Sequence, residues 1–246
     1  MIDDTAGKST RQLAELRRKA RLVVVAIALF CLGLILIHLF RGYQTRDITV
    51  PIICIFAMFG ADRIFNAALD HLMRREKDAI QGAKAEETVA AILSQIPDRV
   101  VIHDISTGQG NIDHILFRKD GAVFLIETKS HRGPISEERA GKFIPQTHRN
   151  IYWLQDFLKA RLGVRLWIKA AIVFPNAYVQ VRRPLRNVEI VSSQYLKPWI
   201  ARTAGNPQIA SKLWSEMDRI KADLEAGRTG YGNLTESNRS SALIGR

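Results

Sequence analysis

Cysteine is scarce in this sequence. Only two of the 246 residues are cysteines, Cys31 and Cys54, and both lie in apolar stretches near the N-terminus. The polar remainder of the chain has none, which excludes a disulfide framework, a cysteine-based zinc cluster and a cysteine nucleophile from that part. The two cysteines do not determine the redox compartment. The sequence also has no internal repeat.

Acidic residues are outnumbered by basic ones. The chain has 24 Asp and Glu against 36 Lys and Arg, which gives a net charge of +12 and a pI near 10.0. Such a surface attracts polyanions, and both nucleic acid and the anionic headgroups of a lipid bilayer are candidate partners. The composition, 47% hydrophobic and 24% charged, is typical of one globular domain with an appendage.

The first long apolar run lies at residues 22–40 and follows a basic segment at residues 1–21. It has no formal charge and, at about 1.5 Å per residue, is long enough for a hydrocarbon core of roughly 30 Å. A cleaved signal peptide is the alternative, but its apolar region would be shorter and a small-x-small site would follow it. Because Arg41 to Gln44 (RGYQ) follow instead, we expect a retained membrane anchor.

A second apolar segment runs over about residues 48–69 and is interrupted by Asp62 and Arg63. Its uninterrupted part reaches only about 21 Å, so the charged pair lies near the interface or the segment lies partly along the membrane surface. Lys and Arg are more frequent before the first segment and after the second than in the loop between them. This distribution predicts an integral protein of the inner or plasma membrane with a transmembrane hairpin whose two ends are cytoplasmic.

The polar part of the chain shows alternating helical and strand patterns. Residues 79–96 have an apolar stripe of helical period that places Glu86 on the inward side. The other expected elements are strands at 99–104, 167–174 and 187–191, helices at 146–162 and 207–226, and a mobile loop at 130–142. The predicted organisation is a basic cytoplasmic N-terminus (1–21), the transmembrane hairpin (22–69), an α/β domain (79–195), a C-terminal helical extension (196–226) and a disordered tail (227–246).

Residues 111–129 (NIDHILFRKDGAVFLIETK) predict a β-hairpin, because two short apolar runs are joined by a turn that ends in Gly121. A three-residue loop with Gly121 in the left-handed conformation places Asp113 directly opposite Glu127. A two-residue loop shifts the register by one residue and separates them. Lys129 projects from the same face as Glu127, since the two are separated by one residue on an extended chain.

These charges lie at the end of an apolar strand face that carries Val123 and Leu125. A buried pair of carboxylates is costly unless a cation neutralises it. Each residue alone has an ordinary explanation: Glu127 and Lys129 as an exposed ion pair worth under about 1 kcal/mol, and Asp113 as a turn residue. Together they favour a shared site. His114, His131 and His148 are expected to be packing or surface residues rather than metal ligands.

The pattern of Gly82 and Glu86, residues 110–114 (GNIDH), residues 126–129 (IETK) and Gln146 resembles the nuclease-related domain (NERD) family of the PD-(D/E)xK nuclease superfamily. The resemblance covers roughly residues 80–191. It implies a restriction-endonuclease-like mixed sheet flanked by helices, and hydrolysis of phosphodiester bonds in DNA with Mg²⁺ or Mn²⁺. The catalytic residues it implies are Asp113, Glu127, Lys129, Glu86 and Gln146, of which Asp113, Glu127 and Glu86 are the metal ligands.

Three functions are compatible with these observations: a membrane-anchored nuclease, an inactive membrane-tethered nucleic-acid-binding or scaffold module, and a protein that binds anionic lipid. The acidic cluster favours the first, because a phosphate-binding module gains nothing from several carboxylates at its binding site. The residues leave open DNA against RNA, and endonucleolytic against exonucleolytic cleavage.

Overall fold

The structure is a computed structural model. It describes residues 7–45, 49–108 and 110–226. The predicted disordered tail at 227–246 lies outside the described residues. The chain divides into two units, one of residues 9–81 and one of residues 1–8 and 82–246. Each unit is described by itself.

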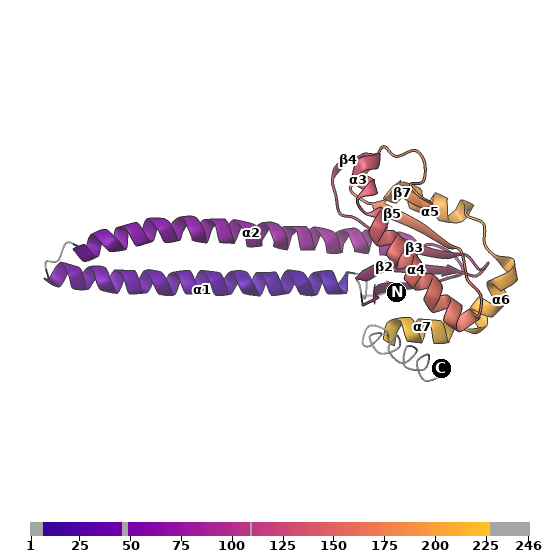
Figure 1. Cartoon of the computed structure of the whole chain (residues 1–246), viewed down its shortest axis with the longest axis horizontal. Coiled ribbons are helices and arrows are strands. Elements are labelled where there is room, and N and C mark those ends of the chain that lie inside the picture. Colours follow the sequence, from indigo (N-terminus) through magenta and orange to yellow (C-terminus); the bar gives the residue numbers. More distant parts are fainter. Residues whose placement is uncertain (1–6, 46–48, 109, 227–246) are drawn as a thin grey trace, which may run out of the picture. The chain divides into compact units, whose positions relative to one another are not determined.

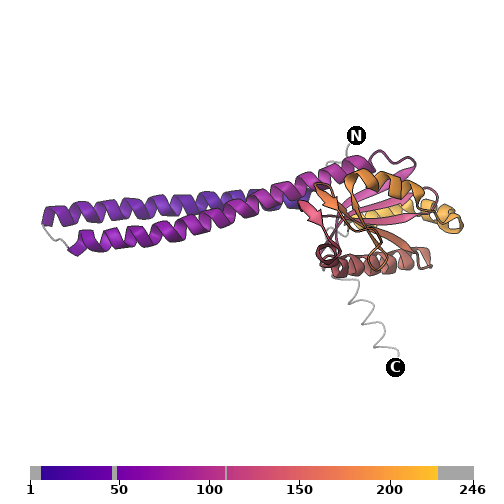
Figure 2. The same cartoon turned by 90° about the horizontal axis from the view of Figure 1, so that it is seen from above.

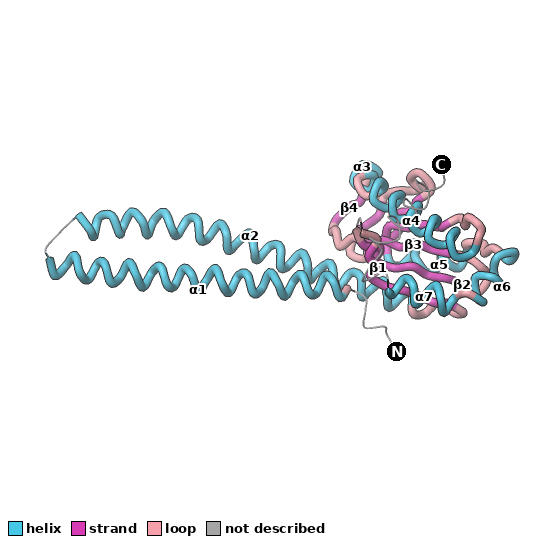
Figure 3. Tube along the Cα trace, turned by 60° about the horizontal axis from the view of Figure 1, so that its bottom comes forward, coloured by secondary structure: helices cyan, strands magenta, loops and turns pink. Residues whose placement is uncertain are grey.

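The unit of residues 9–81 is built from two long helices, α1 (Lys8–Thr45) and most of α2 (Thr49–Leu93). They run side by side in opposite directions (Figure 3). Near their open end, Arg17 Nη1 donates a hydrogen bond of 2.6 Å to the carbonyl oxygen of Arg75, and Arg21 forms an ion pair of 2.9 Å with Glu76. The N-terminal part of α1 therefore lies beside residues 75–76 of α2.

One helix in the described residues, over Thr10–Gln44, is long and apolar enough to cross a membrane by length and composition. It contains the first predicted span. Among the described residues no second apolar helix is found for the second predicted span at about 48–69, and the segment from Thr49 onward belongs to α2, which continues without a break to Leu93. Asp and Arg have ordinary helix propensities, so a charged pair interrupts the hydrophobic pattern without ending the helix. Residues 46–48 and the side chains of residues 50–62 lie outside the described part.

The second unit is a mixed α/β domain that begins with the last turns of α2 (Figure 1). Its strands are β1 (Arg99–Ser106), β2 (Asn111–Arg118), β3 (Val123–Thr128), β4 (Gly133–Ile135), β5 (Ile168–Phe174), β6 (Ala177–Val179) and β7 (Val188–Ser192). Its other helices are α3 (Glu137–Gly141), α4 (Ile144–Leu162), α5 (Ser193–Arg202), α6 (Pro207–Ser215) and α7 (Met217–Ala226).

The main sheet has the strand order β1-β2-β3-β5-β7. Strands β1, β2 and β3 pair antiparallel, whereas β3, β5 and β7 are parallel. The carboxyl ends of the three parallel strands therefore meet at one edge of the sheet. The expected strands at 99–104, 167–174 and 187–191 are confirmed within one or two residues as β1, β5 and β7.

The hairpin of β2 and β3 has the register of the three-residue loop. The amide of Gly121 donates to the carbonyl of Arg118 (2.9 Å), and the amide of Arg118 donates to the carbonyl of Ala122 (2.9 Å). Gly121 has φ +83°, and a Cβ atom there would lie 2.2 Å from the carbonyl oxygen of Asn206. Only glycine meets both constraints at position 121. The pairing of Arg118 with Ala122 excludes the two-residue loop.

Helices cover both faces of the main sheet (Figure 2). The odd-numbered residues of β3 face a core that includes α4, α6 and α7, and the even-numbered residues face the end of α2 and α5. The C-terminal helices are thus integral to the core of the domain. The expected single helix at 207–226 is divided at Glu216 into α6 and α7.

One expectation about an irregular segment is wrong, and one helix was not predicted separately. The loop expected at 130–142 contains β4 and α3, and β4 pairs in parallel with the distant β6. Helix α5 was not expected, and it contains Pro198 five residues after its start. Three buried side chains hold α5 against the sheet: Leu196, Trp199 and Ile200.

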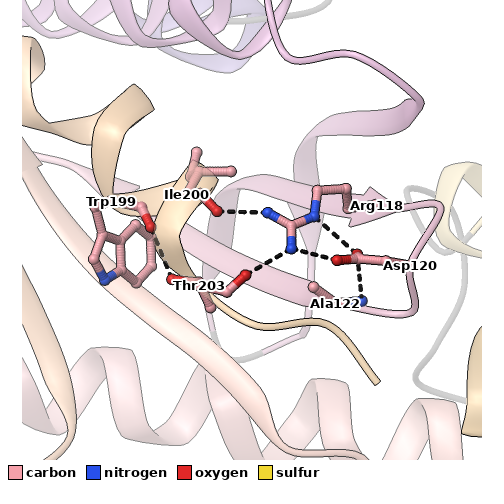
Figure 4. Close-up of polar contacts among 6 residues, drawn as sticks. All are labelled: Arg118, Asp120, Ala122, Trp199, Ile200 and Thr203. Carbon is pink, nitrogen blue, oxygen red and sulfur yellow. Dashed lines mark hydrogen bonds and ion pairs between the residues drawn. The ribbon is translucent and has the colours of Figure 1, made fainter. Parts of the chain in front are cut away.

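The C-terminal helices are tied to the hairpin by the guanidinium of Arg118 (Figure 4). Its Nη1 donates to the carbonyl of Ile200 (2.6 Å), and its Nη2 donates to the carbonyl of Thr203 (2.6 Å) and to Asp120. These carbonyls belong to the last turn and the C-cap of α5, where helical acceptors have no partner within the helix. The hydrogen bond from Arg118 is the main cause that lowers the pKa of Asp120.

Candidate active site

Asp113 and Glu127 lie opposite each other at the open end of the hairpin. His114 pairs with Ile126 in the antiparallel register, so the next pair along the strands is Asp113 and Glu127. Asp113 Oδ2 accepts a hydrogen bond of 2.6 Å from the amide of Thr128. The hairpin loop, six residues away from each of them along the chain, thus determines which two carboxylates meet.

Glu127 is fully buried at the end of the face that carries Val123 and Leu125. Its Oε1 accepts a hydrogen bond of 2.6 Å from Nδ2 of Asn150, and its Oε2 lies 3.4 Å from Nζ of Lys129. Both carboxylate oxygens therefore have donors, which is the condition for burying a charge.

Asn150 was not identified from the sequence. It lies on the inner face of α4, one helical turn before Leu154, and the Nδ2 that contacts Glu127 is also 3.3 Å from the carbonyl of Asn111. The available signal was its spacing, because it follows Gln146 by four residues and both then lie on one side of a helix.

Lys129 directly follows β3, and both its backbone amide and its side-chain ammonium make contacts. Its amide donates a hydrogen bond of 2.9 Å to the carbonyl of Val173. Its Nζ lies near Oε2 of Glu127 and 5.6 Å from the centre of the Phe143 ring. The side chain is 18% exposed, so the ammonium sits at the surface of the site, within reach of an anionic ligand.

The carboxyl of Asp113 has a pKa well above its usual range. Burial is the largest cause, followed by the charge of Glu127; Glu86 raises the pKa further, whereas Lys129 and the amide of Thr128 lower it. Burial and the neighbouring carboxylates therefore disfavour the charged form of Asp113, and Lys129 does not offset them.

Glu86 lies in the last part of α2, is half-buried, and is close enough to Asp113 for its charge to affect that pKa. Among the described residues no three acidic, histidine or cysteine side chains are gathered into a metal-binding group. Glu86 is thus near Asp113, and within the described part of the chain it does not form one group of three with Asp113 and Glu127.

Gln146 lies in the first turn of α4 and is half-buried. It is one helical turn from Asn150, on the side of α4 that faces Glu127. No hydrogen bond joins it to Asp113, Glu127 or Lys129 among the contacts of the described residues. The structure therefore places it beside the site and leaves its predicted role open.

His114, which follows Asp113 on β2, packs beside the site. His114 is fully buried, its Nδ1 lies 2.7 Å from Nδ1 of His103, and its Nε2 lies 3.3 Å from Oγ1 of Thr128. Burial, and then the charge of His103, hold the pKa of His114 well below its usual range. His114 is thus a packing residue, as expected.

The donor set fits a hard divalent cation. Mg²⁺ takes oxygen ligands and is bound by one or two carboxylates, with waters and substrate phosphate completing its shell. Asp113 and Glu127 supply two carboxylates from opposite positions of the hairpin, and the charge of Glu127 is one cause of the raised pKa of Asp113, so a cation between them would offset that repulsion. Neither cysteine of the chain lies in this domain, so it offers no thiolate ligand for a soft metal.

The fold and the site together define an α/β domain with an Asp, a Glu-x-Lys pair and a nearby helical Glu at one end of a mixed five-stranded sheet. Residues 81–175 match the family model of the nuclease-related domain (NERD). The chain therefore contains a nuclease-related domain, as the sequence pattern indicated. No curated protein and no solved structure matches the chain.

Proposed function

We propose that the protein is a metal-dependent nuclease that hydrolyses phosphodiester bonds in DNA and uses Mg²⁺ or Mn²⁺. The observation that carries the proposal is the convergence of Asp113, Glu127 and Lys129, with Asp113 and Glu127 paired in the hairpin and Lys129 at 3.4 Å from Glu127. The nuclease-related domain at residues 81–175 supports the same class of reaction. The mixed sheet with its antiparallel β1-β2-β3 and parallel β5 is compatible with a restriction-endonuclease-like fold.

In this proposal Asp113 and Glu127 would hold the cation. Asn150 positions the carboxylate of Glu127 through its hydrogen bond to Oε1. A bound Mg²⁺ supplies charge stabilisation at the phosphate and lowers the pKa of a water nucleophile. Lys129 Nζ holds a non-bridging oxygen of the scissile phosphate. Glu86 binds the cation or orients the water, and Gln146 positions the water or the DNA backbone.

We also propose that α1 and the adjoining part of α2 anchor the protein in a membrane as a hairpin. The support is the pairing of Arg17 and Arg21 with residues 75–76, which puts the two ends of the hairpin together. If residues 22–40 cross the bilayer, the part of α2 beside them crosses too. Both ends then emerge on one side, and the excess of Lys and Arg there favours the cytoplasm.

This arrangement places Arg63 deeper than the headgroup position expected from the sequence. Arg63 lies about 20 Å along α2 from the Arg21–Glu76 pair, at about 1.5 Å per residue, in a hydrocarbon core of about 30 Å. A charge at that depth costs about 2.5–3.5 kcal/mol on insertion scales. The long side chain reduces this cost when it extends toward water.

The nuclease proposal is tested with the full chain in detergent, incubated with labelled single-stranded and duplex DNA and with the corresponding RNA. We expect cleavage of DNA with Mg²⁺ or Mn²⁺ and none with EDTA. Metal-dependent binding without cleavage would favour the inactive nucleic-acid-binding module. Cleavage that EDTA does not affect would contradict the role of Asp113 and Glu127.

A further inference from the structure

A groove of about 460 Å³ lies beside β7, at the end of the sheet. Its walls come from three segments: the end of β5 with β6 and the chain that follows it, β7 itself, and both ends of α5. All of its lining residues fall within 175–202, so it contains none of the candidate catalytic residues. Its volume is typical of a site for a ligand of nucleotide size.

The groove is positively charged. Its charged side chains are three arginines, Arg182, Arg183 and Arg202, and one acid, Glu189. Burial raises the pKa of Glu189, and the charge of Arg202 acts against this shift, so Arg202 is close to that carboxyl. Arg182 and Arg183 also line the groove, and both are exposed. Two arginines thus remain to face an anion, and Arg is well suited to phosphate.

Two tyrosines in the same groove are unusually exposed. Tyr178 on β6 is 73% exposed and Tyr195 on α5 is 59% exposed. Exposed aromatic rings beside arginines are the arrangement that binds single-stranded nucleic acid, in which bases stack on the rings while the backbone follows the positive charge. The bases of an intact duplex are stacked on one another and cannot use such rings.

The groove and the candidate active site share one edge of the sheet. Lys129 follows the carboxyl end of β3, Pro175 follows that of β5, and Ser192 ends β7. Neighbouring strands are about 4.8 Å apart, so β7, which lines the groove and lies two strands from β3, is about 10 Å from the strand that Lys129 follows. One strand of a duplex advances about 3.4 Å per nucleotide along its axis, which makes this distance about three nucleotides, or fewer in an extended strand.

We propose that this groove binds an unpaired segment of the nucleic acid, whose backbone continues to the Asp113–Glu127 site. The substrate is then a nucleic acid with a single-stranded segment one to three nucleotides from the scissile phosphate. The part of this inference that leads the backbone to a scissile phosphate at the Asp113–Glu127 site rests on the proposed nuclease function. The binding of single strands by the groove stands on its own observations.

Binding is measured separately from cleavage, with the full chain in detergent, the Glu127→Gln background and EDTA. Fluorescence anisotropy gives the Kd of a labelled single-stranded DNA and of the duplex of the same sequence. Tyr178→Ala with Tyr195→Ala should raise the Kd of the single strand by roughly 5- to 100-fold and that of the duplex by less than about 2-fold. Tyr178→Phe with Tyr195→Phe, which keeps both rings, should leave both Kd values near those of the background.

Tyr152→Ala is the matched control, because Tyr152 is 54% exposed on α4 and lies outside the groove. It should change neither Kd. Equal loss for single strand and duplex, no loss in the double alanine variant, or the same loss in Tyr152→Ala would each overturn the inference. A wild-type chain that cleaves no nucleic acid, yet loses single-strand affinity in the double variant alone, would refute the nuclease function and leave the groove assignment intact.

Discussion

Nδ2 of Asn150 donates a hydrogen bond of 2.6 Å to Oε1 of Glu127 and joins the inner face of α4 to the inner face of β3. Both residues adjoin the apolar core, since Leu154 follows Asn150 by one helical turn and Leu125 precedes Glu127 on the same strand face. One carboxylate oxygen is thereby held by α4 and the other lies near Lys129. The position of this carboxylate is thus set by packing between two distant segments.

Asn150→Ala should weaken the metal dependence of cleavage. Partners of ligating groups typically contribute 10- to 100-fold to metal affinity or activity, so we expect a rise of that order in the Mg²⁺ concentration for half-maximal rate. A titration of rate with Mg²⁺ measures it. Arg149→Ala changes the exposed neighbour on the same helix and should leave the Mg²⁺ dependence unchanged. An unchanged titration curve for Asn150→Ala would show that the bond does not position Glu127.

The metal-free protein should lose stability as the pH rises. The pKa of Asp113 is raised in the folded state, so between its unfolded and folded pKa values the native state binds more protons than the unfolded state. The free energy of unfolding then falls as the pH rises through that range. Asp113→Asn removes this titration and still accepts a hydrogen bond from Thr128, so its Tm in EDTA should exceed that of wild type at neutral pH.

Thermal melts in EDTA at intervals from about pH 4 to pH 8 measure this difference. Adding Mg²⁺ should raise the Tm of wild type more than that of Asp113→Asn, because a ligand that binds only the folded state stabilises it. If the two proteins have parallel Tm curves over this pH range, the raised pKa of Asp113 is not coupled to folding.

Arg118→Ala should destabilise the domain by about 2 kcal/mol, because it removes charged hydrogen bonds to two carbonyls of α5 and to Asp120. Arg118→Lys should not restore this stability, since one ammonium does not reproduce the geometry of a guanidinium. Chemical denaturation followed by tryptophan fluorescence measures the change. Arg219→Ala, at a 70% exposed position on α7, should stay within about 0.5 kcal/mol of wild type. Equal effects of Arg118→Ala and Arg219→Ala on the free energy of unfolding would show that the hydrogen bonds from Arg118 to α5 do not stabilise the domain.

Reporter fusions test the membrane topology. A reporter fused after Lys77 should be cytoplasmic and one inserted at Gln44 should be external, because the open end of the hairpin carries the excess of Lys and Arg. Arg63→Leu should leave both results unchanged and increase membrane insertion, since it removes a buried charge. An external reporter after Lys77 would exclude the hairpin and place the domain outside the cell.

The sequence predicted what is decided locally. Gly121 and the alternation of β2 and β3 predicted the hairpin and left two registers, of which the structure has the one that pairs Asp113 with Glu127. Contacts between distant segments were missed: β4 pairs with β6 more than forty residues later, and Asn150 reaches Glu127 from another element. Helix α5 was hidden by Pro198, and the continuity of α2 was hidden by a charged pair that interrupts hydrophobicity without breaking the helix.

The central claim is that Asp113, Glu127 and Lys129 act together in metal-dependent cleavage of DNA. The most direct measurement is the rate of DNA cleavage by the full chain and by Asp113→Ala, Glu127→Ala and Lys129→Ala, each with Mg²⁺ and with EDTA, beside melting curves of the same samples. We predict that all three variants fold and that each loses at least about 100-fold of the Mg²⁺-dependent rate. Folded Glu127→Ala protein that cleaves DNA at the wild-type rate would contradict the account.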